Sequence, residues 1–591
     1  MARRPTTKGN GTNGSDERSI LRVRSVDASV IVERTTPIGA GDLHMSTDNN
    51  ENHSVLFPRL DAQSLRTLQR KGTVRKTTVG EVLFNRETLQ HGLFVVLSGS
   101  IDLVGVANGH DSIISVLAQG EFTGELTQLS GRRSLVSCRV STAGEVLEVD
   151  RASLRHIMQT DAVVGNLLLN AFVQRRIYLI ANAVGDAVLI GSTHSSDTLR
   201  LRSFLVRNGH PYTYLDIDED PDIQSVLDQF GIEVADIPVL ICRGDVVLRA
   251  PSNAEAAVCF DLNAGVDQTD VFDVVIVGAG PSGLAAAVYA ASEGLNVLVV
   301  ESNAPGGQAG SSSRIENYLG FPFGISGQEL ADAAYIQAEK FGARLSIARS
   351  ACTVQCEQHP YRIKLDDGTL IQTRTVVVAT GSRYRRLDIP NVARFDGNGV
   401  YYGATQLEAP LCQGEAVVIV GGGNSAGQAA IFLSSFATKV YLLVRGPNLK
   451  TNMSKYLISR IEASPTIILK TRTTVVALEG GDRLEGIRWM DHLTGESEDH
   501  EVRRLFMMAG ADPNTSWVSG CLSLDTKGFI MTGTSVLADW SLQRAPYPLE
   551  TNVPGVFAVG DVRAESVKRV ASAVGEGSMC IQFVHRALAN Q

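Results

Sequence analysis

The most regular hydrophobic pattern in the chain lies between residues 272 and 301. Phe272–Val277 is an apolar run, interrupted by Asp273 and rich in β-branched residues, which is typical of a buried strand. An Ala-rich stretch that continues to about Glu293 predicts a helix. A second apolar run, Asn296–Val300, predicts another strand, which ends at Glu301. This order of strand, helix and strand predicts an α/β unit with parallel strands.

A glycine-rich turn joins the first of these strands to the helix. Gly278 allows a tight turn, Gly280 lets the backbone approach a pyrophosphate, and Gly283 lets the helix pack on the strand. The helix start offers free N–H groups and a positive dipole end to phosphates. Glu301 can accept hydrogen bonds from a ribose hydroxyl, so the unit predicts a dinucleotide site. The predicted binding residues here are Gly278, Gly280, Pro281, Ser282, Gly283 and Glu301.

A second unit of the same kind begins at Val417. Its apolar strand runs into three glycines, and the next strand is Lys439–Val444. That strand is followed by Arg445, where an acid would favour NAD, and Lys450 lies nearby. Positive charge at this place fits a 2′-phosphate, so we predict NADPH, with NADH as the alternative. The predicted binding residues here are Gly421, Gly423, Asn424, Ser425, Ala426, Arg445 and Lys450.

The first half of the chain has other patterns. Residues 1–54 are polar and predict a disordered tail. Residues 55–183 contain short β-like runs with Gly turns, which predict an antiparallel barrel or jelly roll, followed by one long helix over Ser153–Asn182. Residues 187–261 alternate strands and helices and predict a small α/β domain. Asn263–Thr269 is a polar linker.

Composition narrows the function classes. A chain of 591 residues predicts three to five domains at ~100–200 residues each. The net charge of −9 argues against nucleic-acid binding, and no apolar run is long enough to span a bilayer. Eight cysteines form no dense pattern and no C-x-x-C, which indicates a reducing compartment. We therefore expect a cytoplasmic protein that binds neither nucleic acid nor membrane.

Residues 55–183 resemble the cyclic nucleotide-binding domain family, and Gly124-Glu125-Leu126 carries the match. In that family the Glu of this motif binds the ribose, and a later Arg binds the cyclic phosphate. Glu125 matches directly, but the following segment is short, so either Arg133 or Ser134 stands at the phosphate position. Two alternatives stay open: a cyclic nucleotide site formed by Gly124, Glu125, Arg133 and Ser134, or a domain that has lost its ligand and serves for docking.

Residues 187–261 resemble a thioredoxin or glutaredoxin fold. The second helix of that fold is expected at Pro221–Phe230, and Pro238 stands where the family has a cis-proline. Ser195 and Thr198 fall where the redox dithiol would be. A hydroxyl cannot cycle through a disulfide, so the resemblance implies a scaffold or adaptor without dithiol chemistry.

The two dinucleotide units, with Gly560-Asp561 near the end, resemble the low-molecular-weight thioredoxin reductase family over Val271–Gln591. By that resemblance, residues 271–385 and 515–591 bind FAD, and residues 387–512 bind the pyridine nucleotide. We also expect a homodimer. The further cofactor residues implied by the resemblance are Gly307, Gln308, Asn317, Thr380, Gly381, Gly560, Asp561, Arg569, Val570 and Ala571.

One departure from this family concerns its redox-active cysteines. The family has a C-A-x-C motif shortly before the second dinucleotide unit, and here Gly403 and Gln406 occupy the two cysteine positions. We expect Cys352, Cys356 and Cys412 to be buried apolar residues, with Cys352 and Cys356 too far apart to pair easily.

The sequence thus predicts a multidomain α/β flavoprotein, preceded by a β-barrel or jelly-roll domain and a small thioredoxin-like domain. Its predicted function is FAD-dependent NAD(P)H oxidation, in which electrons pass from NADPH through FAD to an unknown acceptor. A redox protein is one candidate acceptor, and the N-terminal domain would regulate or dock. The alternative is a redox or cyclic nucleotide sensor that reports ligand or redox state without turnover.

Overall fold

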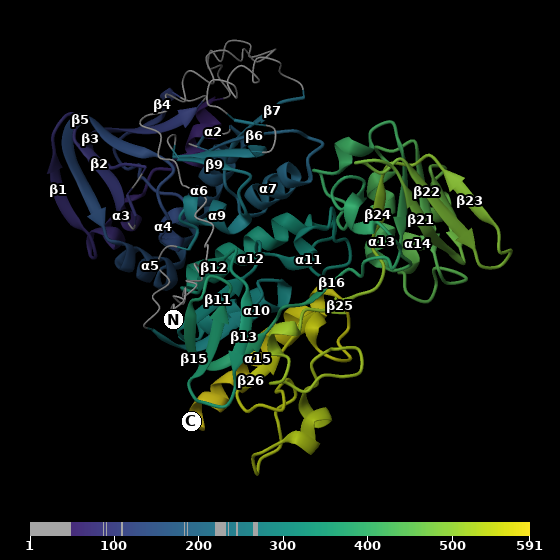
Figure 1. The fold of residues 1–591 in the computed structure, drawn as a ribbon. Helices are drawn as coiled ribbons and strands as arrows, with labels where there is room; N and C mark the ends of the chain where they lie inside the picture. Colours follow the sequence, from purple (N-terminus) through teal and green to yellow (C-terminus); the bar gives the residue numbers. More distant parts are fainter. Residues whose placement is uncertain are drawn as a thin grey trace, which may run out of the picture.

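The computed structural model shows four parts, the last of which is inserted within the sequence of the third (Figure 1). We call them the N-terminal domain, the small domain, the first sheet domain and the second sheet domain. The first and second sheet domains contain the two dinucleotide units. The structure describes residues 49–86, 88–89, 91–107, 110–182, 184–185, 187–218, 232–233, 236–243, 246–263 and 270–591.

The N-terminal domain is an antiparallel sheet covered by helices. Its strand order is β1-β5-β3-β4, with β2 paired to β5. The antiparallel arrangement was predicted; closure into a barrel or jelly roll stays a prediction. The elements are α2 (Asn49–Leu56), α3 (Ala62–Gln69), β1 (Thr73–Thr77), β2 (Val82–Phe84), β3 (Leu93–Ala107), β4 (His110–Leu117), α4 (Thr127–Ser130), β5 (Ser137–Val149), α5 (Arg151–Thr160) and α6 (Ala162–Ala181).

Two predictions for this region were wrong. The expected single helix over Ser153–Asn182 is two helices, because Asp161 leaves the helical conformation and its carboxylate caps the N–H groups of Val163 and Val164. The expected disordered tail also ends too late, since α2 already begins at Asn49. The rest of that tail lies outside the described residues.

The small domain has the strand order β7-β6-β8-β9, with β7 parallel and β8 antiparallel to β6. The Ile237–Pro238 peptide bond is cis, as predicted. The predicted helix Pro221–Phe230 and most of the linker Asn263–Thr269 lie outside the described residues. The elements are β6 (Val188–Gly191), α7 (Ser196–Arg207), β7 (Thr213–Asp216), β8 (Val239–Cys242), β9 (Val246–Arg249) and α9 (Asn253–Cys259).

The first sheet domain contains a mostly parallel seven-stranded sheet. Its order is β12-β11-β10-β15-β14-β13, with β26 parallel to β15 and with β13, β14 and β15 antiparallel. Its elements are β10 (Val271–Val277), α10 (Pro281–Ser292), β11 (Val297–Glu301), α11 (Gly307–Gly310), α12 (Gly327–Phe341), β12 (Arg344–Ile347), β13 (Ala351–Gln355), β14 (Tyr361–Leu365), β15 (Leu370–Val378), η4 (Ser516–Val518), η5 (Gly533–Asp539), β26 (Val556–Ala558), η6 (Gly560–Val562) and α15 (Val570–Ala589). The predicted strand, helix and strand are therefore confirmed.

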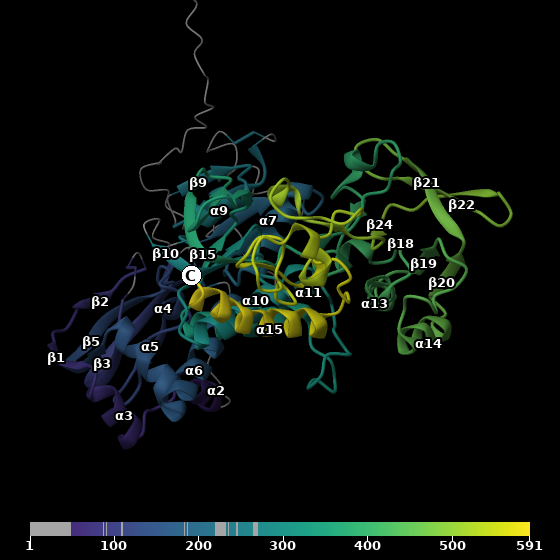
Figure 2. The ribbon, with the colours of Figure 1, turned by 90° about the horizontal axis from the view of Figure 1, so that it is seen from below.

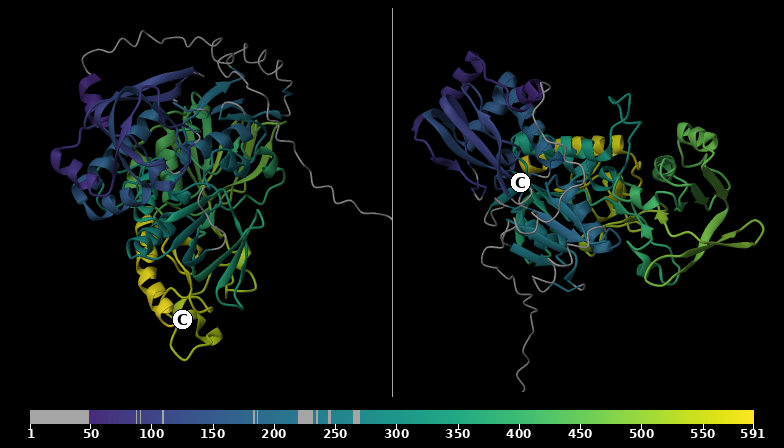
Figure 3. Two further views of the ribbon diagram at one scale, coloured as in Figure 1. Left: turned by 90° about the vertical axis from the view of Figure 1, so that its left-hand side faces the viewer. Right: turned by 90° about the horizontal axis from the view of Figure 1, so that it is seen from above.

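The second sheet domain lies on one side of the first, opposite the N-terminal domain (Figures 1, 2 and 3). A parallel sheet of order β17-β24-β18-β19-β20 packs beside an antiparallel sheet of order β21-β22-β23, and the pair β16-β25 joins the two sheet domains. Its elements are β16 (Ser382–Arg383), η2 (Val392–Phe395), β17 (Val400–Tyr401), η3 (Ala409–Cys412), β18 (Ala416–Val420), α13 (Asn424–Leu433), β19 (Lys439–Val444), α14 (Lys455–Ala463), β20 (Ile467–Thr471), β21 (Thr473–Glu479), β22 (Gly486–Asp491), β23 (Ser497–His500), β24 (Leu505–Met507) and β25 (Asp512–Pro513).

The small domain and the first sheet domain share one hydrophobic core. Phe204 and Leu205 of α7 belong to the same buried cluster as Ala286 and Ala290 of α10. Burial of a large aromatic or aliphatic side chain contributes about 1.5–3 kcal/mol. The small domain is therefore packed onto the first sheet domain over a shared apolar interior.

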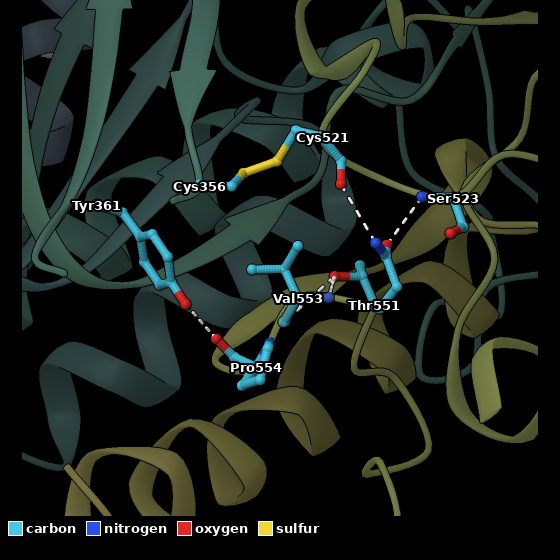
Figure 4. The surroundings of a disulfide bond; sticks show 8 residues. Cys356, Tyr361, Cys521, Ser523, Thr551, Val553 and Pro554 are labelled. Atoms are coloured by element: carbon cyan, nitrogen blue, oxygen red, sulfur yellow. Dashed lines mark hydrogen bonds between the residues drawn. A yellow bond between two sulfur atoms is a disulfide. The ribbon is translucent and has the colours of Figure 1, made fainter. Parts of the chain in front are cut away.

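The cysteine predictions need correction. Cys356, which follows β13, forms a disulfide with Cys521, which follows η4 (Figure 4). Cys242 and Cys259 form a second disulfide, inside the small domain. Cys352 is exposed, and only Cys412 is buried as predicted. The true partner of Cys356 is 165 residues away, so the spacing of neighbouring cysteines could not reveal it.

Across the part of the chain that the structure describes, no helix is both long and apolar enough to cross a membrane. The same residues contain no group of His, Cys, Asp and Glu side chains arranged to hold a metal ion.

Candidate functional site

A cavity of about 590 Å³ lies at the carboxyl ends of β10 and β11. This is the edge at which open parallel sheets bind their ligands. Residues from both sheet domains and from the small domain line it. The predicted cofactor residues in its wall are Gly278, Gly280, Pro281, Ser282, Glu301, Gly307, Gln308, Asn317, Thr380, Gly381, Asn424, Ser425, Asp561, Arg569 and Val570.

The other predicted residues lie outside the lining of this cavity. They are Gly283, Gly421, Gly423, Ala426, Arg445, Lys450, Gly560 and Ala571. For Gly283 this agrees with its predicted packing role, because a Cβ there would collide with the carbonyl oxygen of Gly278. Gly560 has a similar role, since a Cβ there would meet the side chain of Ser282.

The glycine turn leaves room for a ligand at one position. Gly278 has φ +107°, and a Cβ there would strike the carbonyl of Ala379, so only glycine fits. At Gly280, by contrast, the nearest atom to a built Cβ is the Cα of Gly307 at 3.9 Å. The space in front of Gly280, at the start of α10, is therefore open, as a close approach of a pyrophosphate requires.

Glu301 ends β11 at the wall of the cavity. Its carboxylate accepts hydrogen bonds from the N–H groups of Ala279 (2.7 Å) and Asn303 (2.9 Å). Burial raises the pKa of Glu301, while these two bonds and the charge of Arg207 oppose that rise. The backbone thus holds the carboxylate in one orientation, beside the glycine turn.

The far end of the cavity is built by the start of α15 and by η4. Burial raises the pKa of Asp561, and the charge of Lys568 opposes the rise. Among the described residues, the buried Nε1 of Trp517 has no hydrogen-bond partner, and Trp517 lines the cavity. Buried polar atoms usually find partners, so this N–H group fits a polar ligand.

The second dinucleotide unit faces the same cavity. Asn424 and Ser425 stand at the start of α13, and Gln428 lies one turn further along that helix. Tyr384 reaches across from the connection between the sheet domains; burial raises its pKa, and a hydrogen bond with Ser425 opposes the rise. The start of α13 therefore contributes to the wall of the same cavity as the first unit.

Arg445 and Lys450 are exposed beyond the end of β19. A Cβ at Gly423, the residue before α13, would have no atom within 4 Å. The second unit therefore leaves an open approach to its helix start, with two exposed cations in the loop after the neighbouring strand.

Sequence reasoning missed several residues of the cavity wall. Gln428 could have been found, because it is four residues after Asn424 and shares a helix face with it. Arg207 could not, because it belongs to the small domain, in another part of the chain. The other missed residues include Ser311, Ser312, Arg349, Ser350, Tyr384, Asn514, Trp517 and Lys568.

The segment that carries Gly403 and Gln406 lies next to the cavity. Ala404 pairs with Ser312, and a Cβ at Gly403 would lie 4.0 Å from the Cβ of Ser311. Cys412 is buried in the second sheet domain, and burial raises its pKa to about 12. Its thiol is therefore neutral near pH 7, which makes it a poor nucleophile.

In the N-terminal domain, the predicted nucleotide residues have partners within the protein. Glu125 forms an ion pair with Arg176 of α6 (2.6 Å) and also accepts the N–H of Thr127 (3.0 Å). Arg133 is buried and faces Asp261 of the small domain (3.7 Å). The Ser134 hydroxyl donates to the carbonyl of Val136 (2.7 Å).

The cavity within this domain is small. Gly124, Glu125 and Ser134 line a space of about 30 Å³, together with mainly apolar side chains. That volume is about the share of one water molecule in the liquid. The structure brings three of the four predicted residues together but leaves no room between them for a nucleotide.

Comparison with known proteins shows which families the chain resembles. The family model for pyridine nucleotide-disulphide oxidoreductases matches residues 272–577, and the model for the cyclic nucleotide-binding domain matches residues 74–161. The chain is 34% identical to the thioredoxin reductase of Ureaplasma parvum over 309 residues, which cover 52% of this chain and 94% of that protein.

Two further similarities cover the same half of the chain. One component of the alkyl hydroperoxide reductase of Escherichia coli is 30% identical over 337 residues, 56% of this chain and 61% of that protein. The crystal structure of Lactococcus lactis thioredoxin reductase superposes with a TM-score of 0.50 at 27% identity and covers 54% of this chain and 100% of that one.

Proposed function

Because the chain belongs to the pyridine nucleotide-disulphide oxidoreductase family, we propose that it is an FAD-dependent NADPH oxidoreductase that delivers electrons to an external acceptor. The observation that carries this proposal is the single cavity whose wall contains residues of both dinucleotide units. An enzyme that moves a hydride between two nucleotide cofactors needs the two sites to face each other.

The residues present fit FAD. Gly280 leaves open space at the start of α10, and Trp517 offers a buried N–H group that lacks a partner among the described residues. In our proposal Glu301 binds the adenosine ribose, and Asp561 accepts a hydrogen bond from the ribityl chain. When bound, FAD supplies the two-electron chemistry that connects NADPH to the acceptor.

We assign the nicotinamide cofactor to the second sheet domain. Asn424 and Ser425 hold the phosphates at the start of α13, and Arg445 and Lys450 pair with the 2′-phosphate of NADPH. Burial of Tyr384 between the two sites would exclude water there.

The acceptor is external in this proposal because the chain offers no suitable dithiol. Gly403 and Gln406 replace the two family cysteines beside the cavity. Of the eight cysteines, four form disulfides and Cys138, Cys412 and Cys580 are buried, each with a pKa raised by burial. Cys352 is exposed and is not part of either disulfide.

We assign structural roles to the two domains that precede the oxidoreductase region. In the small domain Ser195 is the N-cap of α7 and accepts the N–H of Thr198, so both proposed dithiol positions serve the helix start. In the N-terminal domain the carboxylate of Glu125 already forms an ion pair with Arg176. We therefore favour a thioredoxin-like adaptor without dithiol chemistry and a docking domain without cyclic nucleotide.

Anaerobic titration with NADPH tests the proposed function. The purified protein should bind FAD, and its flavin absorbance should bleach on addition of NADPH and recover when an acceptor is added. With thioredoxin and insulin as acceptors, we expect no turnover. Flavin that stays oxidised during long exposure to NADPH would contradict the enzyme and favour a sensor.

The thioredoxin assay needs one control, which is prior alkylation of Cys352. Turnover that survives alkylation would contradict the proposed lack of a dithiol relay. Turnover that alkylation abolishes would contradict it too, and would assign the relay to that thiol.

The choice of NADPH has its own test. Arg445→Ala should weaken the binding of NADPH roughly tenfold or more and leave the binding of NADH nearly unchanged. The reason is that a charge-assisted hydrogen bond contributes about 1.5–3 kcal/mol. Arg472→Ala, in the loop after the next strand, is a matched control. Equal losses for both cofactors would assign Arg445 a structural role.

A further inference from the structure

Arg207 is a cation of the small domain that lies in the wall of the FAD cavity. It is the last residue of α7. The family model begins only at residue 272, so Arg207 lies outside the part of the chain that defines the oxidoreductase family. Its presence in the cavity is a consequence of how the small domain packs on the first sheet domain.

The contacts of Arg207 place it beside the glycine turn. Its Nη2 donates a hydrogen bond to the carbonyl of Gly307 (2.9 Å). Gly307 in turn packs directly against Gly280, because a Cβ built on Gly307 would lie 2.9 Å from the Cα of Gly280. The guanidinium is therefore bonded to Gly307, which packs against Gly280, the position that leaves open space for a pyrophosphate.

The guanidinium is also incompletely satisfied. Its Nε is buried and has no hydrogen-bond partner among the residues that the structure describes. Burial lowers the pKa of Arg207, and the charges of Glu301 and Asp332 oppose this. A buried charge without full compensation is costly, and an anion bound in the cavity would supply what is missing. Arg presents a planar fork of donors that matches phosphate oxygens.

The surroundings hold Arg207 in place without a ligand. Phe204 of the same helix is part of the shared core, and the side chain of Asn208 donates to the carbonyl of Asn303 (3.4 Å). Arg176 of the N-terminal domain donates to the carbonyl of Gly209 (3.0 Å). Both preceding domains thus fix the end of α7, which means that little side-chain entropy is lost when a ligand binds.

We propose that Arg207 is an FAD-binding residue contributed by the small domain, and that its guanidinium pairs with the diphosphate of the cofactor. This inference rests on the proposed function, since it takes FAD as the occupant of the cavity. The small domain then forms part of the cofactor site, although it lies outside the family's own fold.

The experiment measures cofactor affinity in apoprotein of the full chain, by calorimetric titration with FAD, ADP and adenosine. Arg207→Ala should weaken FAD and ADP roughly 10- to 150-fold, because a charge-assisted bond to a phosphate is lost. Adenosine lacks the diphosphate, so Arg207→Ala should weaken its binding by less than about twofold. Arg207→Lys keeps the charge but not the fork, so its affinity for FAD should lie between those of wild type and Arg207→Ala.

Arg202→Ala is the matched control. Arg202 lies on the same helix, but its guanidinium stacks over Tyr214 (4.1 Å). This variant should bind FAD as wild type does. Unchanged FAD affinity in Arg207→Ala, equal losses for ADP and adenosine, or an equal loss in Arg202→Ala would each overturn the role of Arg207. Should Arg207→Ala not fold, as judged by circular dichroism, Arg207→Lys decides: affinity equal to wild type would overturn the role.

The two proposals can fail separately. A wild-type protein that binds no FAD would contradict the proposed function itself. Wild-type binding of FAD, with Arg207→Ala and Arg207→Lys unaffected, would overturn only the inference about Arg207.

Discussion

The chain contains two sites of nucleotide-binding families, and they differ in what their own side chains do. The cavity of the first sheet domain has about 590 Å³ of space, with Trp517 presenting an unpartnered N–H group in its described wall. The cavity of the N-terminal domain has about 30 Å³, and its family glutamate, Glu125, is paired with Arg176. The fold therefore provides the place for a ligand, whereas the local side chains decide whether a ligand can bind there.

The N-terminal cavity is closed by a second arginine. Arg175 donates to the carbonyls of Leu56 and Gly124, both at 2.7 Å, and stacks over Phe57 (4.6 Å). It therefore ties α2 and α6 to the Gly124–Leu126 segment. Burial lowers the pKa of Arg175 to about 9, which still leaves it charged near neutral pH.

The first prediction concerns a substitution that would fill the open space at Gly280, in the cavity of the first sheet domain. Gly280→Val should reduce bound flavin to roughly a tenth or less, because the side chain would occupy the space left for the pyrophosphate. The fold should survive, since Gly280 has φ −70° and the nearest atom to its Cβ lies at 3.9 Å. Flavin content per protein, measured by absorbance, checks this.

Gly283→Ala is the contrasting variant. Its Cβ would collide with the carbonyl of Gly278 inside the turn, so it should lower the melting temperature even in the apoprotein. Normal flavin content in Gly280→Val would contradict the assigned cofactor position.

The second prediction concerns the ion pair between Glu125 and Arg176 at the cavity of the N-terminal domain. Arg176→Met should lower the free energy of unfolding by about 3–5 kcal/mol, because it leaves the buried carboxylate of Glu125 without its cation. Denaturant unfolding measures this. Wild type should show no calorimetric signal with a cyclic nucleotide. Arg86→Met, which removes a cation 3.4 Å from the exposed carboxylate of Asp111, should change stability little. Binding of a cyclic nucleotide by wild type would contradict the docking role.

The third prediction concerns a support of the open site. The Cys356–Cys521 disulfide joins β13, which begins at the cavity residue Ala351, to the segment that follows the cavity residue Trp517 (Figure 4). Replacement of both cysteines by Ser should lower the free energy of unfolding by about 2–4 kcal/mol. Cys352→Ser is the control, because that thiol is exposed and free. Equal stability of the double variant and the control would argue against a structural role.

The fourth prediction concerns the contact between the small domain and the open site. Burial raises the pKa of Asp332 from 3.8 to about 6, while Gln328 donates to its carboxylate (2.7 Å). Between about pH 4 and pH 6 the folded state therefore binds more protons than the unfolded state, so this group lowers stability as pH rises. Asp332→Asn should be more stable than wild type at pH 7.5 by about 1–2 kcal/mol, after allowance for its partial exposure.

The sign of this effect makes it easy to test. The difference between Asp332→Asn and wild type should shrink as the pH falls from 6 toward 4 and vanish below the unfolded pKa of 3.8, where the carboxyl group is protonated in both states. A difference that does not depend on pH would show that packing or hydrogen bonding, and not titration, explains the variant.

Local patterns predicted local structure well. The apolar run at Phe272–Val277, the glycine turn and the end of the next strand at Glu301 all appear where the sequence places them. The reason is that strand, turn and helix preferences act over a few residues and agree with one another here. The break at Asp161 was missed because a capping carboxylate inside a long apolar pattern is a weak signal.

Contacts between distant segments could not be predicted in this way. The sequence by itself determined the two glycine turns and the strands and helices that flank them. Only the tertiary structure decided that Cys356 pairs with Cys521. The same holds for the ion pair between Arg176 and Glu125, and for the place of Arg207 in the wall of the large cavity. Each of these contacts depends on how whole domains pack, and that packing is set by the shape of buried apolar surfaces, which no short motif encodes.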